Sequence, residues 1–396
     1  MVAWLTRVFG PAHLELAEEV VQDALVKALQ QWPHTGVPGN PAGWLMRVAR
    51  NGAVDALRRH ASFRDRIPAV EAELYRDTPP DSKSDDAIGD DELRMVFMCC
   101  HPLLPPEARV ALSLKVACGF SVREIARAFL APEATIAQRL VRAKRALRAE
   151  GITLELPGGA DLAARLEAVL EVVYLLFNEG YKAEGGDDLI RVDLCREALR
   201  LGRALAASPL TGTPAAHALV SLMAFQAARL DARVDGEGEL VLLQDQDRSR
   251  WDPRLIGLGF AHLAMSAEGP RMTAYHAQAA IAALHARTAS AADTPWPAIL
   301  SRYGDLMTIA PSPVVALNRA VALAKVEGAA AGLDALAAIE RANALDGYHL
   351  FWSVKGQLLA ETGQRHEARA AYENALALPC SEPERRFLRR RLDALG

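Results

Sequence analysis

The most constraining feature of the sequence is a repeat near its end, in which small and apolar residues recur at one spacing. The later copy, GYHLFWSVKGQLLAETGQRHEARAAYENALALP, contains Trp352, Gly356, Ala368, Tyr372 and Ala375. The earlier copy, VVALNRAVALAKVEGAAAGLDALAAIE, contains Ala320, Gly332, Leu336 and Ile339, each 36 positions before its counterpart. In helix-turn-helix repeats, small residues let two helices approach and larger side chains fill the remaining space. The tail is therefore expected to consist of paired helices.

The same pattern, less regular, extends over much of the chain. The repeat length is close to the roughly 34 residues of a tetratricopeptide repeat. The stretch 161–310 is expected to form further helix pairs, so that 161–396 becomes a stacked helical array. An irregular helical bundle is the alternative. Since alanine and leucine, which favour helix, are abundant throughout, the fold class is predicted to be all-α.

Two breaks divide the rest of the chain. The segment DTPPDSKSDDAIGDD is rich in proline, serine and aspartate and predicts a flexible linker. The second break is ELPGG. The expected parts are a helical domain at 1–59, an acidic linker at 60–91, a compact helical domain at 92–150 and the helical extension at 161–396.

Charge is distributed unevenly among these parts. The formal net charge is −4, yet residues 92–150 carry 10 basic and 5 acidic side chains, whereas residues 60–91 carry 4 and 9. A basic module within an acidic chain is typical of a domain that binds a polyanion.

Other classes of protein find little support. The N-terminal stretch lacks the features of a signal peptide, no apolar run approaches the roughly 20 residues that span a bilayer, and the 5 cysteines form no disulfide framework. A cytoplasmic protein without membrane association is expected. Gly257-Leu-Gly259 lacks the third glycine of a dinucleotide turn, and DQDRSRWD has Arg250 where a calcium loop needs glycine. Cys99-Cys100-His101 lacks a second ligand pair for zinc. We therefore expect no enzyme, no catalytic residue, no cofactor and no metal.

The basic module contains a helix-turn-helix pattern. Gly119 ends one helix, and Ser121 with Glu124 forms a capping box for the next. That short helix stops before Pro132, which fits the first turn of a second helix, ATIAQRLVRAKRALR. Two helices joined by a tight turn, the second basic, are typical of duplex DNA readers. A solvated basic face without function is the alternative.

The second helix divides by face. Ile136, Leu140, Ala143 and Leu147 recur at helical spacing and are expected in the core. In such motifs the early residues of the recognition helix meet base edges and later ones meet phosphates. The candidates for base contacts are Thr135, Gln138 and Arg139, and those for phosphate contacts are Arg142, Lys144 and Arg145.

The first 59 residues predict two amphipathic helices. In LAEEVVQDALVKALQQW, Val20, Ala24, Leu25 and Leu29 are expected on the buried side, with Glu18, Glu19, Gln22 and Asp23 outside. In AGWLMRVARNGAVDALRR, the expected buried stripe is Trp44, Leu45, Val48, Ala49, Gly52 and Ala56. The basic and polar face of this second helix consists of Arg47, Arg50, Asn51, Arg58 and Arg59. Such a face beside a polar loop suits single-stranded nucleic acid, because cations follow the backbone and the loop can enclose an unstacked base.

These motifs together resemble a bacterial sigma factor of the extracytoplasmic-function type in the sigma-70 family. The resemblance rests on LAEEVVQDALVKALQQW, WLMRVARNGAVDALRR, the acidic linker and QRLVRAKRALR, in that order. CCHPLLPPEARVAL, YLLFNEGY, LVLLQDQDRSRWD and PSPVVALNRAVA further resemble a subgroup with a long tetratricopeptide-like extension. One departure is that the first helix begins almost at Met1, so that helix is expected to be short.

The resemblance implies a partner for each surface. Core RNA polymerase, through its β′ and β subunits, would be one partner and promoter DNA the other. The β′ clamp would receive the helix that carries Glu18, Glu19, Gln22, Asp23 and Lys27. The −10 element would be captured by the loop Thr35–Asn40, including Asn40, and by Arg47, Arg50, Asn51, Arg58 and Arg59. The linker would pass through the RNA exit path, and the helix-turn-helix would read the −35 element.

The extension is expected to regulate the sigma domains, through an intramolecular contact or a contact with polymerase. Two other functions stay open at this point. One is a stand-alone DNA-binding regulator whose repeats sense a ligand or a protein, and the other is an enzyme in the C-terminal part. Binding to core polymerase distinguishes the sigma factor from the stand-alone regulator.

Overall fold

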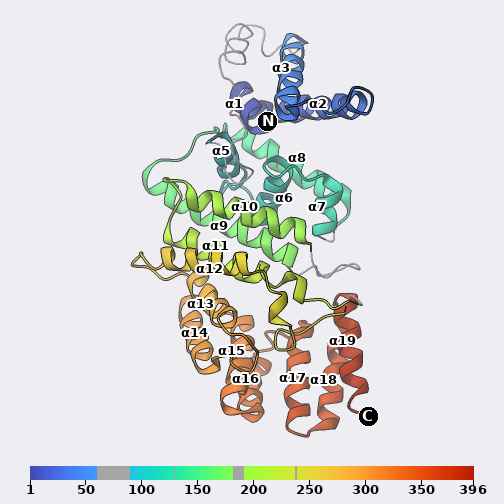
Figure 1. Ribbon diagram of the computed structural model, residues 1–396, viewed down its shortest axis with the longest axis vertical. Helices are drawn as coiled ribbons and strands as arrows, with labels where there is room; N and C mark the ends of the chain where they lie inside the picture. Colours follow the sequence, from blue (N-terminus) through green and yellow to red (C-terminus); the bar gives the residue numbers. More distant parts are fainter. Residues whose placement is uncertain (60–89, 130, 182–190, 237–238) are drawn as a thin grey trace. The chain divides into compact units, whose positions relative to one another are not determined.

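The computed structural model describes residues 1–59, 90–129, 131–181, 191–236 and 239–396. Most of the acidic linker expected at 60–91 thus lies outside the described residues. The described residues form two compact units, Met1–Leu175 and Leu176–Gly396, and Figure 1 shows that helices build both. No strand forms within these ranges, and the one isolated bridge joins Val234 and Leu240. The all-α prediction is confirmed.

The first unit begins with three helices around one apolar core. They are α1 (Val2–Phe9), α2 (Leu14–Thr35) and α3 (Pro41–Arg59), with a 3-10 turn, η1 (Pro11–His13), between the first two. The short first helix is apolar enough to be held by packing, because Trp4, Leu5, Val8 and Phe9 are all buried. These side chains lie in one cluster with Val20 of α2 and Ala53 of α3, among others.

The rest of the first unit contains the helix-turn-helix, which is formed by α7 (Val122–Ala128) and α8 (Glu133–Ala149). The other helices of this part are α5 (Asp90–Cys99), α6 (Pro106–Val116) and the first part of α9 (Gly159–Tyr181). The capping box is confirmed: the Ser121 N–H donates to Glu124 Oε2 at 2.7 Å, and the Glu124 N–H donates to Ser121 Oγ at 3.1 Å. Gly119 has φ 75°, which permits the tight turn between α6 and α7. Pro132 is the N-cap of α8 instead of its first helical residue.

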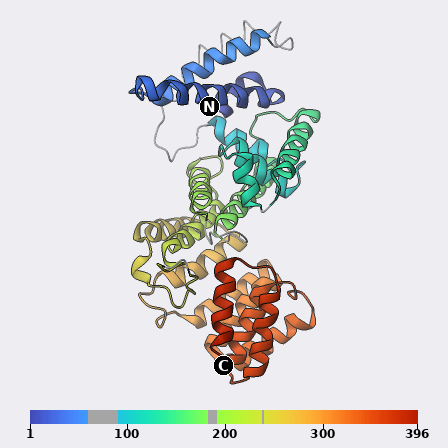
Figure 2. The same cartoon turned by 90° about the vertical axis from the view of Figure 1, so that its right-hand side faces the viewer.

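The second unit consists of further helices, most of them paired. They are α10 (Val192–Ala207), α11 (Pro214–Ala227), α12 (Pro253–Ser266), α13 (Ala274–Ala286), α14 (Trp296–Ile309), α15 (Pro313–Glu327), α16 (Ala329–Arg341), α17 (His349–Glu361), α18 (Arg365–Ala377) and α19 (Glu382–Asp393). Figure 2 shows the last helices of the chain lying side by side. No helix in the described parts of the chain is long and apolar enough to cross a membrane.

The repeat positions behave as the spacing predicts. A Cβ added to Gly356 would lie 3.0 Å from the ring of Tyr372, so α17 and α18 meet at these two residues. A Cβ on Gly332 would lie 2.7 Å from the Cβ of Ala324 and 2.9 Å from Leu358, which leaves no room for a side chain there. The small residues therefore permit the close helix pairs that the sequence predicts.

A glycine, Gly180, lies inside the last turn of α9. A Cβ at this position would meet the Arg191 carbonyl oxygen and the Leu194 Cβ, both at 2.8 Å. The glycine is therefore required by the close approach of the residues that start α10, rather than by a helix end.

Candidate nucleic-acid and polymerase interface

The exposed face of α8 carries most of the residues predicted to contact duplex DNA. Thr135, Gln138, Arg142 and Arg145 are all exposed. The opposite face is fully engaged, because the predicted core residues Ile136, Leu140, Ala143 and Leu147 are all buried. The helix therefore presents two arginines and two hydrogen-bonding side chains to solvent, on a support that fixes their orientation.

The other two predicted DNA contacts on α8 are already paired. Arg139 forms a salt bridge with Glu107 of α6 at 3.0 Å, and its guanidinium lies 5.7 Å from the centre of the Phe129 ring. Lys144 forms a salt bridge with Glu18 of α2. Neither cation is as available to a phosphate as Arg142 or Arg145. Sequence patterns could not predict these pairs, because both acidic partners are distant in the chain.

The Lys144–Glu18 pair joins two surfaces that the sequence assigns to different partners. Only 13% of the Lys144 side chain and 12% of the Glu18 side chain are exposed, so the expectation that Glu18 lies outside is wrong. A second pair between the same helices joins Arg148 and Glu15 at 3.1 Å. Acidic side chains of α2 thus neutralise part of the positive charge of α8 within the first unit.

The buried side of α2 also differs from the prediction. Val20 and Ala24 are buried as expected, but Leu25 and Leu29 are 45% and 76% exposed, together with the neighbouring Val26. The buried line runs instead through alanines, including Ala28, whose small side chains let α2 lie close to its neighbours. The prediction that Leu25 and Leu29 lie on the buried side is therefore wrong. The remaining predicted docking residues are exposed: Glu19, Gln22, Asp23 and Lys27.

The predicted basic face of α3 is only partly exposed. Arg47, Asn51 and Arg58 are exposed, whereas Arg50 is half-buried with its guanidinium 6.0 Å from the centre of the Trp4 ring. The side chain of Arg59 lies outside the described part of the structure. In the expected buried stripe, Ala49 and Ala56 are buried, while Trp44, Leu45, Val48 and Gly52 are half-buried.

The loop before α3 is held at both ends. The Asn40 side chain accepts a hydrogen bond from the Gly43 N–H at 2.8 Å, as an N-cap does. Trp32, near the end of α2, packs edge-on against Trp44 with ring centres 5.5 Å apart. Asn40 therefore has a structural role that the sequence prediction did not include.

The adjacent pair Cys99 and Cys100 shows no sign of reactivity. Cys99 and Cys100 are free thiols and fully buried. Burial raises the pKa of Cys100 to about 11 and that of Cys99 well above its ordinary value, so both stay protonated at neutral pH. No group of three or more potential metal ligands occurs among the described residues.

Known families match most of the chain. Residues 1–63 match Sigma-70 region 2, and residues 94–147 match Sigma-70, region 4. Residues 165–267 match a family of unknown function (DUF6596), and residues 307–396 match a tetratricopeptide repeat-like domain. No solved structure matches significantly.

Curated relatives agree with these matches. A Rhizobium meliloti protein, Uncharacterized protein R00370, is 42% identical over 97% of this chain and 91% of its own length. The ECF RNA polymerase sigma factor SigL of Mycobacterium tuberculosis is 32% identical over 33% of this chain and 72% of its own length. The ECF RNA polymerase sigma-E factor of Escherichia coli is 29% identical over 33% of this chain and 70% of its own length.

These matches cover both DNA-contacting modules and the helical extension, in the order found in the structure. Sigma factors bind core RNA polymerase and promoter DNA. The chain therefore belongs to the extracytoplasmic-function group of the sigma-70 family, and is an RNA polymerase sigma factor for transcription initiation with a tetratricopeptide-like C-terminal domain.

Proposed function

We propose that three surfaces of the first unit have separate roles in transcription initiation. The exposed face of α8 reads the −35 element, the exposed face of α3 with the loop before it holds the −10 element, and α2 docks on the β′ subunit. The role is non-enzymatic and cytoplasmic. We assign these surfaces to the domains 1–59 and 92–150, joined by the linker 60–91.

The observation that carries the −35 assignment is the division of α8. One side of α8 is buried in the domain that also contains α7, the helix with the capping box. The other side presents Gln138, Arg142 and Arg145, all of which are exposed. Amide side chains read base edges in the major groove, whereas guanidinium groups hold phosphates. An exposed face of this composition fits a duplex better than it fits an apolar partner.

The exposed leucines support the docking assignment for α2. Contiguous exposed apolar side chains mark interaction sites, and Leu25, Val26 and Leu29 lie within two turns of one helix. The acidic Glu19 and Asp23 on the same helix are exposed. An apolar strip beside acidic groups suits a protein partner rather than nucleic acid, because phosphates would be repelled.

Run-off transcription with purified core RNA polymerase tests the function. On a pool of promoter fragments, we expect transcripts only with this protein, starting downstream of a shared two-part motif. DNA binding without transcripts would instead favour the stand-alone regulator.

A substitution in α2 tests the docking surface. Leu29→Glu should weaken binding to core polymerase by at least about tenfold, because it puts a charge into an apolar contact. Folding should be unaffected, since the side chain is mostly exposed. The control is Leu210→Glu, which alters another exposed leucine in the second unit. Equal binding of both variants would contradict the assignment of α2.

We further propose that the extension at 161–396 regulates the sigma domains. Most of α9, up to Leu175, belongs to the first unit, and Arg165 in it donates to the Phe97 carbonyl at 2.9 Å. A truncation that tests the extension should therefore end after residue 175. Promoter-dependent transcription by the truncated chain should differ from that of the full chain, and equal output would refute regulation.

A further inference from the structure

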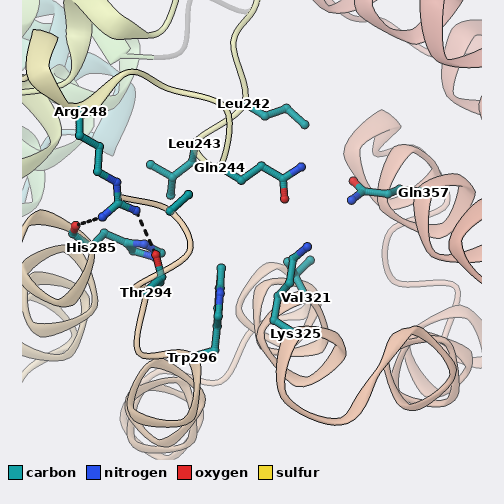
Figure 3. A pocket seen from close by; sticks show the side chains of 11 residues that line it. Leu242, Leu243, Gln244, Arg248, His285, Thr294, Trp296, Val321, Lys325 and Gln357 are labelled. Carbon is teal, nitrogen blue, oxygen red and sulfur yellow. Dashed lines mark hydrogen bonds between the residues drawn. The ribbon is translucent and has the colours of Figure 1, made fainter. Parts of the chain in front are cut away.

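The second unit contains a cavity of about 220 Å³, and helices form only part of its wall. The segment between α11 and α12 leaves the helical pattern and covers part of it (Figure 3). The other walls come from the end of α13, the start of α14 and the faces of α15 and α17. The residues that the argument uses are Leu243, Gln244, Arg248, His285, Trp296 and Lys325.

One end of the cavity is built around Arg248. Its guanidinium donates to the His285 carbonyl at 2.8 Å, to the Thr288 carbonyl at 2.9 Å and to the Thr294 hydroxyl at 3.0 Å. All of these acceptors are neutral, and Asp293 attracts Arg248 without a hydrogen bond or ion pair between them among the described residues, so the arginine is held by neutral groups.

The wall beside Arg248 is aromatic and neutral. His285 is 9% exposed, and its ring meets Trp296 edge-on, with ring centres 5.5 Å apart. Burial, with Arg229 and Arg248 nearby, lowers the pKa of His285 to about 4, so the ring is uncharged at neutral pH. Its buried Nδ1 has no hydrogen-bond partner among the described residues. The half-buried Trp296 thus offers a flat apolar surface, and Leu243 lies beyond the edge of its ring in Figure 3.

The charge of the lining is one-sided. It includes the two cations Arg248 and Lys325 and no acidic residue. Residues 176–396 contain 24 basic and 26 acidic side chains, so a lining without acid is a local departure. Lys325 is exposed on α15 and forms no ion pair within the described ranges. The cavity therefore favours a molecule with a negative charge as well as an apolar body.

Size limits the ligand to a small molecule. A cavity of about 150 Å³ lined by apolar side chains binds benzene, so about 220 Å³ holds one ring with a short substituent. Small-molecule sites are mostly apolar, with a few polar groups that fix orientation, which is the composition found here. We propose that this cavity binds a small aromatic carboxylate, with its ring between Leu243 and Trp296 and its carboxylate near Lys325 and Gln244.

Calorimetric titration of the purified full chain tests the site, with phenylacetate as the probe. Phenylacetamide has the same ring without the charge, and acetate has the charge without the ring. We expect saturable binding of phenylacetate with a Kd on the order of 1 mM or tighter. Because a charge-assisted hydrogen bond is lost, phenylacetamide should bind about 5- to 10-fold more weakly, and acetate should show no saturable binding.

Two variants locate the binding site. Lys325→Gln should abolish the preference for the acid over the amide, whereas Arg319→Gln, which removes an exposed cation from the same helix outside the lining, should keep it. Val321→Phe should block both ligands by filling the cavity, with circular dichroism confirming that the helices are retained. The proposal is overturned if phenylacetate does not bind, or if it binds Lys325→Gln with its preference unchanged.

Discussion

Two cations on α8 differ in their availability to DNA, and this difference predicts contrasting effects on binding. Arg142 is exposed, whereas Lys144 pairs with Glu18 and is 13% exposed. Each phosphate neutralised by a side chain contributes about 0.9 to the slope of log K against log salt concentration. Arg142→Ala should therefore lower that slope by about 0.9, while Lys144→Met should leave it nearly unchanged.

The slope difference gives a measurable change in affinity. Between about 50 and 200 mM salt, a slope of 0.9 corresponds to a factor of about 3.5 in the binding constant. The wild-type chain should lose that much more affinity over this range than Arg142→Ala. The assay is fluorescence anisotropy with a labelled duplex that carries the −35 element recovered from run-off transcription.

The comparison of Lys144 with Arg142 needs a variant that leaves no buried charge unpaired. Replacing Lys144 alone would leave Glu18 buried without its partner, which destabilises the unit. The double variant Glu18→Gln with Lys144→Met removes both charges and should bind DNA with the wild-type salt slope. Arg145→Ala, which removes a second exposed cation, should behave like Arg142→Ala. If the Lys144 variants lower the slope as much as Arg142→Ala does, Lys144 leaves Glu18 on binding and the reasoning is refuted.

Three further predictions follow from other parts of the structure. Gln138→Ala should change the discrimination between −35 sequences by about 1–3 kcal/mol, measured by competition with single-base variants of the element; uniform weakening across all sequences would contradict base reading. Gly259→Ala should destabilise the second unit by about 1–3 kcal/mol in chemical denaturation, because the new Cβ would lie 2.6 Å from the Phe225 ring. Gly257→Ala on the same helix meets nothing within 4 Å and should be tolerated. The pKa of His285 is lowered to about 4, below its unfolded value near 6.5, so the unfolded state binds more protons between these values. Stability should fall as the pH drops from about 6.5 to 4, and His285→Gln should melt with a shallower pH dependence.

Much of the fold followed from local patterns. The capping box at Ser121 and Glu124 depends on residues three positions apart, and the core stripe of α8 depends on helical periodicity. The contact between Gly356 and Tyr372 joins neighbouring helices of one repeat. Such features are set by short-range geometry, so the sequence alone predicts them well.

The burial of α2 shows where local patterns fail. The amphipathic pattern predicted Leu25 and Leu29 on the buried side, together with Val20 and Ala24. In the structure the alanine line is buried and Leu29 is 76% exposed. Only the packing against α1 and α3 decides this, because close approach of helices favours small side chains over large ones.

The sequence by itself determined the helical class, the helix-turn-helix with its exposed basic face, and the paired helices of the tail. Each depends on residues within one or two helices of each other. The tertiary structure alone decided that Lys144 pairs with Glu18, that α2 exposes an apolar strip, and that the segment before α12 lines a cavity without acidic residues together with segments from α13 to α17. Those features join residues far apart in the chain, whose proximity is set by packing and not by any local spacing.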